Sequence, residues 1–308
     1  MHRTIEMTVM PAATACLLAE LARLDGVIGL TVSRGASFKP PGDVVTVHAL
    51  NRDTDAVLQC AQRAGEHGPV SIVTAEVASI IDPAHADAID DDIDEAVWEE
   101  METGLRHQGR VTANYLVLMA LGGAIATVGL VSDPVPQVTA FVAASIIAPG
   151  FEPLVKIPLG LVLRRGNVVR RGLVSTGVGY LVLIGAAALV FLLLRLSGAI
   201  TVDALVHNPE VERLAHPSGL DLIVSACGAV AGVTMVAAYR RSVIAGPLIA
   251  LVFIPAAALV GVALVVGRWT LLVDGLKRLG IDVALLIVLG VLVLIVKQLT
   301  VHRRAPLV

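Results

Sequence analysis

The sequence has few charged and few aromatic residues for its length of 308 residues. Asp, Glu, Lys and Arg make up 16% of the chain, whereas average soluble domains contain about 25%. Phe, Trp and Tyr make up 3%, and the formal net charge is −3. Recognition of nucleic acid needs a basic face and often aromatic rings on which bases stack. The composition therefore argues against a nucleic-acid partner.

The chain also lacks the residue patterns of common enzymes and metal sites. Its three cysteines, Cys16, Cys60 and Cys227, form no Cys-x-x-Cys pair and no metal-ligand spacing. We interpret them as reduced, packed residues rather than reactive ones. No Ser/His/Asp order, His-Glu-x-x-His sequence or paired-carboxylate motif stands out. We therefore expect no enzymatic activity, no cofactor and no bound metal.

The first ten residues, MHRTIEMTVM, lack the apolar core of a cleavable signal peptide. We therefore expect the soluble part that follows to stay in the cytoplasm.

Apolar residues, by contrast, make up 56% of the sequence, and long stretches after residue 110 carry no acidic group. This distribution predicts a soluble domain over residues 1–81, an acidic connecting helix over residues 82–110 and a transmembrane domain over residues 111–308. The lipid bilayer is then the main environment of the chain.

The soluble domain reads as strand, helix, strand, strand, helix, strand. Ile5, Met7 and Val9 alternate with polar residues, which is typical of a strand. The other segments are a helix that opens at Pro11, strands over 27–33 and 44–50 around a turn-rich loop at 34–42, a helix capped by Asp53, and a strand over 70–80. This order predicts a ferredoxin-like α+β fold with both helices on one face of the sheet. Such a domain serves either ligand sensing or assembly, and the fold alone does not decide between them.

The connecting segment predicts one helix over 87–106, with an apolar residue at every fourth position and many carboxylates between them. The carboxylates form either a Ca²⁺ or Mg²⁺ site or a solvated helix face. We favour the solvated face, because the spaced ligands and the Gly turn of an EF-hand are missing.

Six stretches are long and apolar enough to cross a bilayer. They cover residues 111–131, 136–163, 171–196, 219–239, 243–267 and 280–300. Prolines interrupt the second stretch at Pro149, Pro153 and Pro158, and the fifth stretch at Pro247 and Pro255. The transmembrane domain is therefore predicted to be an α-helical polytopic bundle of about six spans, two of them broken.

The positions of Lys and Arg predict the orientation, because cytoplasmic loops carry more of them. With the N-terminus in the cytoplasm, the inner flanks contain Arg106, Arg110, Arg164, Arg165, Arg170, Arg171, Arg240, Arg241, Arg303 and Arg304. The outer loop at 197–218 has only Arg213. The loop predicted at 268–279 disagrees, because Arg268, Lys277 and Arg278 would lie outside. Most of the Lys and Arg residues therefore favour both termini on the cytoplasmic side of the inner membrane.

The two halves of the transmembrane domain resemble each other. Gly-Ala-Ile-Ala-Thr-Val at 123–128 is similar to Gly-Ala-Val-Ala-Gly-Val at 228–233, and each is followed by a proline-interrupted span and then an uninterrupted one. Three spans per copy is an odd number, so a true repeat has inverted topology, as in many secondary transporters. The alternative is that short Gly/Ala/Val matches arise by chance in apolar sequence.

Two charges lie within the second span, where charge is costly. Glu152 and Lys156 are four residues apart, which allows them to pair on one helix face. Glu152 either binds a cation or proton that Lys156 balances, or the two form a structural pair; Lys156 also has the length to snorkel toward Arg164. Asp221 is either a buried carboxylate or an acid at a helix start near Ser218, and we favour the helix start. The candidate substrate- or ion-binding residues are Ser145, Pro149, Glu152, Pro153, Lys156, Asp221 and Pro255.

Three of these features also resemble a known family. The run Ser-Ile-Ile-Ala-Pro at 145–149 continuing to Pro153, the segment 221–232 and the βαββαβ-like front are similar to the DUF389 family of hydrophobic bacterial and archaeal membrane proteins. The resemblance covers nearly the whole chain and implies its architecture, but it implies no established activity. Family members usually have small or apolar residues near Pro153, whereas this chain has Glu152 and Lys156.

The function predicted from the sequence is a transporter or channel-like protein of unknown substrate. The soluble domain would regulate the transporter or hold protomers together as a homo-oligomer. The ligand of the transporter would be a small solute or ion. The alternative is a membrane-anchored sensor or scaffold whose soluble domain binds a ligand or partner. An intramembrane enzyme is the least favoured of the three.

Overall fold

The computed structural model describes residues 2–93, 95–107, 109–238 and 245–302. Four arginines used for the orientation, Arg240, Arg241, Arg303 and Arg304, lie outside these residues. The chain divides into two compact units: Met1–Glu99 together with Gln298–Val308, and Glu100–Lys297. Each unit is described by itself.

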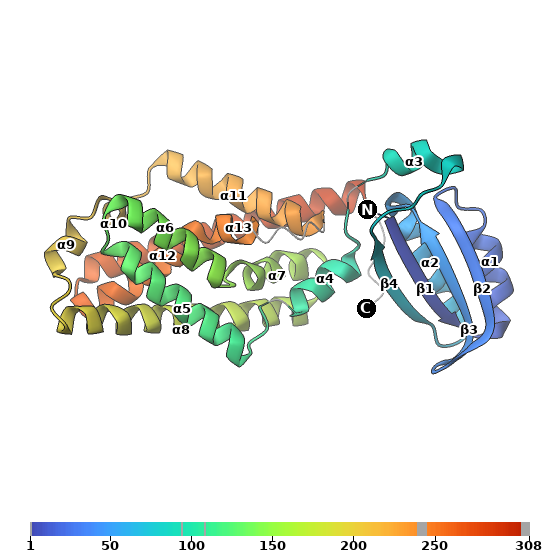
Figure 1. Cartoon of the computed structure of the whole chain (residues 1–308), viewed down its shortest axis with the longest axis horizontal. Coiled ribbons are helices and arrows are strands. Elements are labelled where there is room, and N and C mark those ends of the chain that lie inside the picture. The colour runs from blue at the N-terminus through green and yellow to red at the C-terminus, as the bar shows by residue number, and fades with distance from the viewer. Residues whose placement is uncertain (1, 94, 108, 239–244, 303–308) are drawn as a thin grey trace. The chain divides into compact units, whose positions relative to one another are not determined.

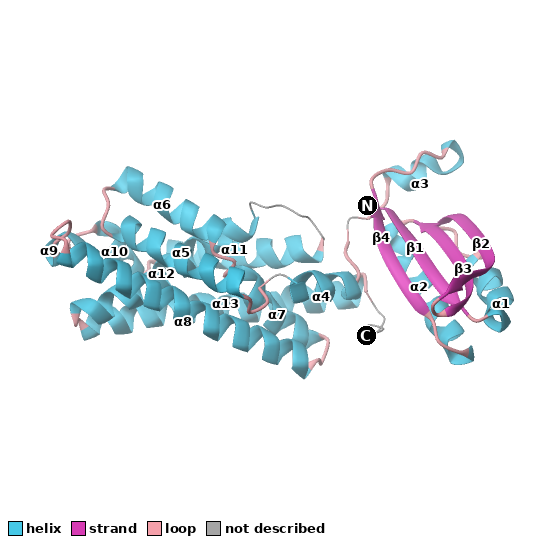
Figure 2. Cartoon of the chain, turned by 60° about the horizontal axis from the view of Figure 1, so that its bottom comes forward, coloured by secondary structure: helices cyan, strands magenta, loops and turns pink. Residues whose placement is uncertain are grey.

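The first unit contains a four-stranded antiparallel sheet with two helices on one of its faces (Figure 1; Figure 2). Along the chain the elements are β1 (His2–Val9), α1 (Pro11–Leu21), β2 (Val27–Phe38), β3 (Pro41–Ala49), α2 (Thr54–Ala64) and β4 (Ser71–Val77). The strands are ordered β2-β3-β1-β4 across the sheet. Short 3₁₀ helices lie at Asn51–Asp53, Gly65–His67 and Pro83–His85.

The core of this unit lies between the sheet and the two helices. Ile5 and Met7 of β1 are fully buried and lie opposite Val47 and Val45 of β3. Because alternate side chains of a strand point to one face, this period-two pattern places the apolar set against the helices. The helices contribute Leu17, Leu21, Val57, Leu58 and Ala61.

The turn-rich loop predicted at 34–42 is largely strand. β2 continues through Phe38, and β3 begins at Pro41. Gly35 has a φ of +64°, which suits glycine, and the pairing is irregular between Ser33 and Ser37. Gly35, which was predicted to lie in a loop, thus lies at an irregularity in the strand pairing of a long hairpin.

The single helix predicted over 87–106 is instead two helices, α3 (Ala86–Asp90) and α4 (Trp98–His107). Asp92, in the break, accepts hydrogen bonds from the backbone N–H groups of Asn51 (2.6 Å) and Arg52 (3.2 Å). A long-range contact therefore competes with the helix, in a run of acids whose mutual repulsion already weakens it.

The second unit is helical. Its elements are α5 (Ala113–Leu130), α6 (Pro134–Ile147), α7 (Phe151–Val162), α8 (Gly166–Leu196), α9 (Val202–Val206), α10 (Pro209–Ala215), α11 (Gly219–Ala237), α12 (Ala245–Val266) and α13 (Trp269–Thr300), whose last three residues count with the first unit. Pro134 and Pro209 begin their helices, at positions where the missing N–H costs nothing.

Among the described residues, four helices are long and apolar enough to cross a membrane: α5, α8, α11 and α13. The pair α6 and α7 makes a fifth if it counts as one bent span. The span predicted at 243–267 corresponds to α12, and its first two positions lie outside the described residues. The apolar helices indicate a membrane environment.

The loop predicted at 268–279 is absent, because α13 is one helix of 32 residues that begins at Trp269. Lys277 forms an ion pair with Asp274 at 3.4 Å, and Arg278 pairs with Asp282. Lys277 and Arg278, which were predicted to lie in a loop, are therefore paired with acidic residues of the same helix. Arg278, which seemed to contradict the orientation, is a buried residue.

A glycine of α8 allows the side chain of a neighbouring helix to pack closely against α8 in this unit. At Gly179 of α8, a Cβ atom would lie 2.7 Å from Cζ of Tyr115 in α5. The Tyr115 hydroxyl donates to the carbonyl oxygen of Ser175 at 2.8 Å. Small residues allow such approach, which is how helices associate where lipid removes the hydrophobic driving force.

Candidate functional site

The apolar segment 134–162 is broken in its middle. α6 and α7 are bent by 54° around Ala148, Pro149 and Gly150. Ala148 has an extended backbone with a ψ of 115°, as expected for a residue that precedes proline. Pro149 itself has no N–H to continue the helix. The local sequence therefore causes the break.

The break is packed tightly against neighbouring helices. A Cβ on Gly150 would lie 3.0 Å from the Tyr180 hydroxyl oxygen of α8 and 3.1 Å from Cδ1 of Ile254 of α12. Pro153 is the third residue of α7, in the first turn, where its missing N–H is not needed. Pro158 lies inside α7 and close to Gly290 of α13.

Polar groups gather around this break. The Tyr180 hydroxyl donates to the carbonyl oxygen of Gly150 at 3.4 Å. Glu152, the second residue of α7, interacts electrostatically with the hydroxyls of both Tyr115 and Tyr180. Backbone groups freed by a broken span need such partners or a ligand, because lipid offers none.

Three buried side-chain oxygens on the helices that meet here have no hydrogen-bond partner within the described part of the chain. They are Oγ of Ser145 in α6, Oε2 of Glu152 in α7 and Oγ1 of Thr176 in α8. Buried polar atoms are normally paired, so each such atom calls for an explanation, and a site for a ligand or water supplies one.

Lys156 does not pair with Glu152. Its ammonium group donates to the carbonyl oxygen of Gly109 at 3.0 Å, and the residue is 4% exposed. Both side chains are among the described residues, and no ion pair joins them. The two side chains are therefore not in direct contact, although their charges interact through space. Lys156 reaches the end of the bundle where α8 begins, which agrees with snorkelling toward the basic flank.

Asp221 and Pro255 lie elsewhere in the unit. Asp221 forms a capping box with Ser218 at the start of α11, which confirms the helix-start interpretation, and it also pairs with Arg213 at 2.7 Å. Pro255 lies inside α12. Both residues line a cavity of about 160 Å³, together with Arg278. The predicted site residues thus occupy three places: the break, the cavity beside Asp221, and the surroundings of Lys156.

A buried ion pair was missed by the sequence reasoning. Nε of Arg278 lies 2.8 Å from a carboxylate oxygen of Asp282, and Nη2 of Arg278 donates to the Ser225 hydroxyl of α11 at 2.9 Å. The spacing of four residues is a detectable signal, but only when the helix is extended back to Trp269.

The family model described as Domain of unknown function (DUF389) matches residues 145–289. Residues 145–289, slightly less than half of the chain, are thus similar to this family. The DUF389 segment begins at Ser145 and contains the break, Glu152, Lys156, Asp221, Pro255 and the Arg278–Asp282 pair. No curated protein and no solved structure matches the chain.

Within the described residues, no three His, Cys, Asp or Glu side chains are grouped as metal ligands. The polar groups of the DUF389 segment at the break are one carboxylate, hydroxyls and backbone carbonyls. Oxygen ligands of this kind suit a proton, a hard cation or a hydrogen-bonding solute.

Proposed function

We propose that this protein is a transporter or channel-like protein that binds a small solute or ion at the break between α6 and α7. The observation that carries the proposal is the 54° bend inside an apolar segment, next to the buried and unpartnered Oε2 of Glu152. A segment that serves only as an anchor needs neither feature. Broken helices in transporters expose backbone groups to a ligand near the middle of the membrane.

We propose that Glu152 is the ligand-binding carboxylate, in protonated form or with a bound cation. An ionised, unpaired carboxylate in hydrocarbon is costly, by about 2.5–3.5 kcal/mol on insertion scales. A proton or cation removes that cost, and the Tyr115 and Tyr180 hydroxyls provide neighbouring polar groups.

An inverted repeat is part of the proposal. α5 and α11 have 18 and 19 residues, and α8 and α13 have 31 and 32 residues. Between them lie the broken pair α6–α7 and α12, which contains Pro255. This matching of lengths and interruptions supports two copies of three spans each, inserted with opposite orientation.

Six spans with both termini in the cytoplasm are the proposed topology in the inner membrane. Met1–Glu99 and Gln298–Val308 form one unit, so a soluble unit on one side of the membrane requires an even number of crossings between them. Four spans and the bent pair make five, and α12 supplies the sixth. A single cysteine introduced at Gly166 of a cysteine-free chain should resist labelling from outside intact cells, and ready labelling would overturn the orientation.

We propose that the first unit is a ferredoxin-like domain that regulates transport or holds protomers together as a homo-oligomer. The strand order β2-β3-β1-β4 and the two helices on one face support the fold. In the sensor or scaffold alternative, the first unit would retain its ligand or partner and the helices would bind nothing.

Thermal unfolding of the purified full-length protein with a panel of ions and small solutes tests the site. A ligand that binds the folded state raises its unfolding temperature. At least one panel member should stabilise the wild type and Glu212→Gln, which removes an exposed carboxylate of α10, but not Glu152→Gln. A ligand that stabilises Glu152→Gln as strongly as the wild type would contradict the site. Stabilisation by none of them would favour the anchor.

A further inference from the structure

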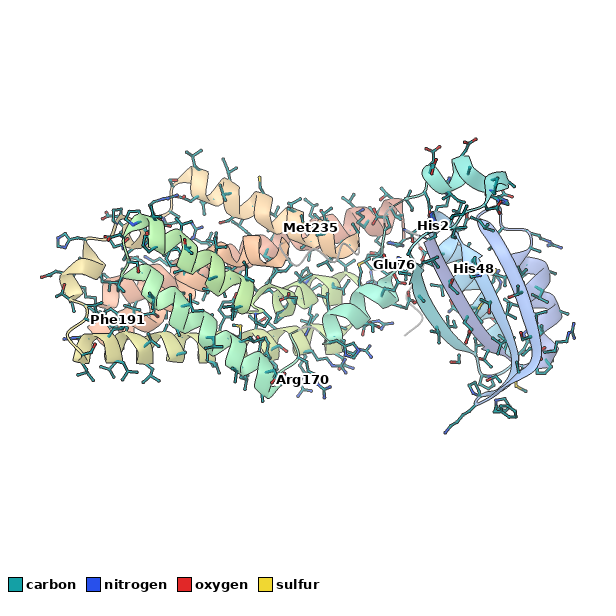
Figure 3. The ribbon with its side chains drawn as sticks, in the orientation of Figure 1. His2, His48, Glu76, Arg170, Phe191 and Met235 are labelled. Atoms are coloured by element: carbon teal, nitrogen blue, oxygen red, sulfur yellow. The ribbon has the colours of Figure 1, made fainter. Side chains whose placement is uncertain are left out.

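A larger cavity lies apart from the α6–α7 break, at the end of the helical unit where α8 begins. Its volume is about 650 Å³, which is within the range of small-molecule sites. The wall is formed by the end of α4, the segment between α4 and α5, one residue of α7 and the first turns of α8. Figure 3 shows Arg170, one of its residues, and Phe191 toward opposite ends of α8.

The charge of this cavity is strongly one-sided. Its cationic side chains are Arg106, Arg110, Lys156, Arg170 and Arg171, and His107 lies beside them. Glu102 is the one carboxylate in the wall. That carboxylate already binds Arg106 and Arg165, each at 2.7 Å. The protein therefore supplies far less negative charge than the cavity needs for neutrality.

The remaining cations have no carboxylate partner. Within the described residues, Arg110, Arg170 and Arg171 make no side-chain hydrogen bond or ion pair. Lys156 is 4% exposed, and its ammonium group contacts the neutral carbonyl of Gly109, while the Glu152 carboxylate interacts with it only through space. A buried ammonium without an anion in direct contact is unfavourable, and a bound anion compensates it.

The first turn of α8 adds to the positive potential. Asn167 and Val168 line the cavity, and the preceding Arg165 provides no side-chain cap to this helix of 31 residues. Uncapped N–H groups and the helix dipole both favour an anion at such an end.

We propose that this cavity binds a phosphate-bearing anion, either the headgroup of an anionic lipid or a free phosphate compound. Arginine guanidinium groups match phosphate oxygens in paired hydrogen bonds, and Lys156 adds a point charge at the buried end. Basic pockets among transmembrane helices are also suited to lipid headgroups. The inference does not depend on transport, because no residue of the α6–α7 break lines the cavity.

Full-length protein in lipid nanodiscs tests both sources of the anion. One arm uses phosphatidylcholine discs titrated with inorganic phosphate, and the other uses discs of phosphatidylcholine with phosphatidylglycerol and no added phosphate. The readouts are the unfolding temperature and the hydrogen exchange of residues 165–175. Stabilisation and protection by inorganic phosphate in the first arm would identify a free anion as the ligand. The same effects in the second arm alone would identify a lipid headgroup. Neither effect in either arm would overturn the proposal.

The matched variants keep the test specific. The double change Arg170→Gln and Arg171→Gln should weaken binding by roughly tenfold or more, because it removes charge-assisted hydrogen bonds. Arg195→Gln, in the last turn of the same helix, should bind like the wild type. Arg110→Gln repeats the test if the double variant does not fold. Equal binding by wild type and pocket variants, or an equal loss in Arg195→Gln, would contradict the site.

Discussion

The side chains of Arg278 and Asp282 lie one helical turn apart on α13, are both buried, and approach to 2.8 Å between Nε and the carboxylate. Breaking a buried pair leaves the other charge without compensation. We expect Asp282→Asn to lower the free energy of unfolding by about 3 kcal/mol or more, measured by denaturation in detergent.

Two controls accompany this prediction. Arg278→Met combined with Asp282→Leu should recover most of the loss, because a pair replaced as a unit is often neutral. Breaking the neighbouring exposed pair of Asp274 and Lys277 should lower the free energy of unfolding by less than about 1 kcal/mol. Equal costs for the two pairs would show that burial is unimportant here.

Two glycines of α8 provide a matched comparison. A Cβ at Gly179 would lie 2.7 Å from the Tyr115 ring, whereas nothing lies within 4 Å of a Cβ at Gly177. Gly179→Ala should therefore destabilise the protein by about 1–3 kcal/mol through overpacking. Gly177→Ala should be neutral or stabilising by up to about 1 kcal/mol, because alanine favours helix. Thermal unfolding in detergent distinguishes the two, and similar shifts would contradict the packing of α5 on α8.

Asn208 connects three segments of the helical unit. Its Nδ2 donates to the carbonyl oxygens of Leu130 and Ser132, both at 3.2 Å, and its Oδ1 accepts from Gln137 at 3.1 Å and from the N–H of Glu210 at 2.9 Å. Asn208→Ala leaves these groups unsatisfied, so we expect a loss of about 1–3 kcal/mol. His207→Ala, at an exposed neighbour, should stay within about 0.5 kcal/mol of the wild type.

Asp43 gives the first unit a dependence on pH. The backbone N–H of Gly35 and the hydroxyl of Thr14 donate to its carboxylate and hold the pKa of Asp43 below its ordinary value of 3.8. A lowered pKa means that the carboxylate stabilises the fold at pH above 3.8, and that this contribution is lost as the pH falls through the folded pKa.

The measurement uses fluorescence of the buried Trp98 in a Trp269→Phe background of the full chain. Asp43→Asn should lower stability at neutral pH and reduce its decline under acid. Asp87→Asn, at an exposed position, should retain the wild-type profile. An unchanged acid profile in Asp43→Asn would contradict the role of Asp43.

Local patterns predicted much of the first unit. The alternation of Ile5, Met7 and Val9 specified which face of β1 is buried, because the period of a strand is two. The extension of β2 through Phe38 was not visible in the sequence, because Gly and Pro at 34–42 are equally typical of a loop.

In the helical unit, contacts between residues distant in sequence could not be predicted from local patterns. The spacing of Glu152 and Lys156 suggested a pair, yet Lys156 contacts Gly109, which lies 47 positions away. The start of α13 was misread because hydropathy counts Asp274, Lys277 and Arg278 as separate charges, whereas the helix pairs them with neighbours three or four residues away. The break at Pro149 was predictable, because its cause is local.

The makeup of the first unit has a consequence for biosynthesis. His302 belongs to the same unit as Trp98 and Asp55: its ring lies 5.2 Å from the Trp98 ring, and its Nδ1 lies 3.0 Å from the Asp55 carboxylate. The ribosome makes the sheet first, but it supplies His302 only after every helix of the second unit. Domains that emerge first normally finish folding first. Here the first unit receives its last side chains only when the complete set of helices has left the ribosome.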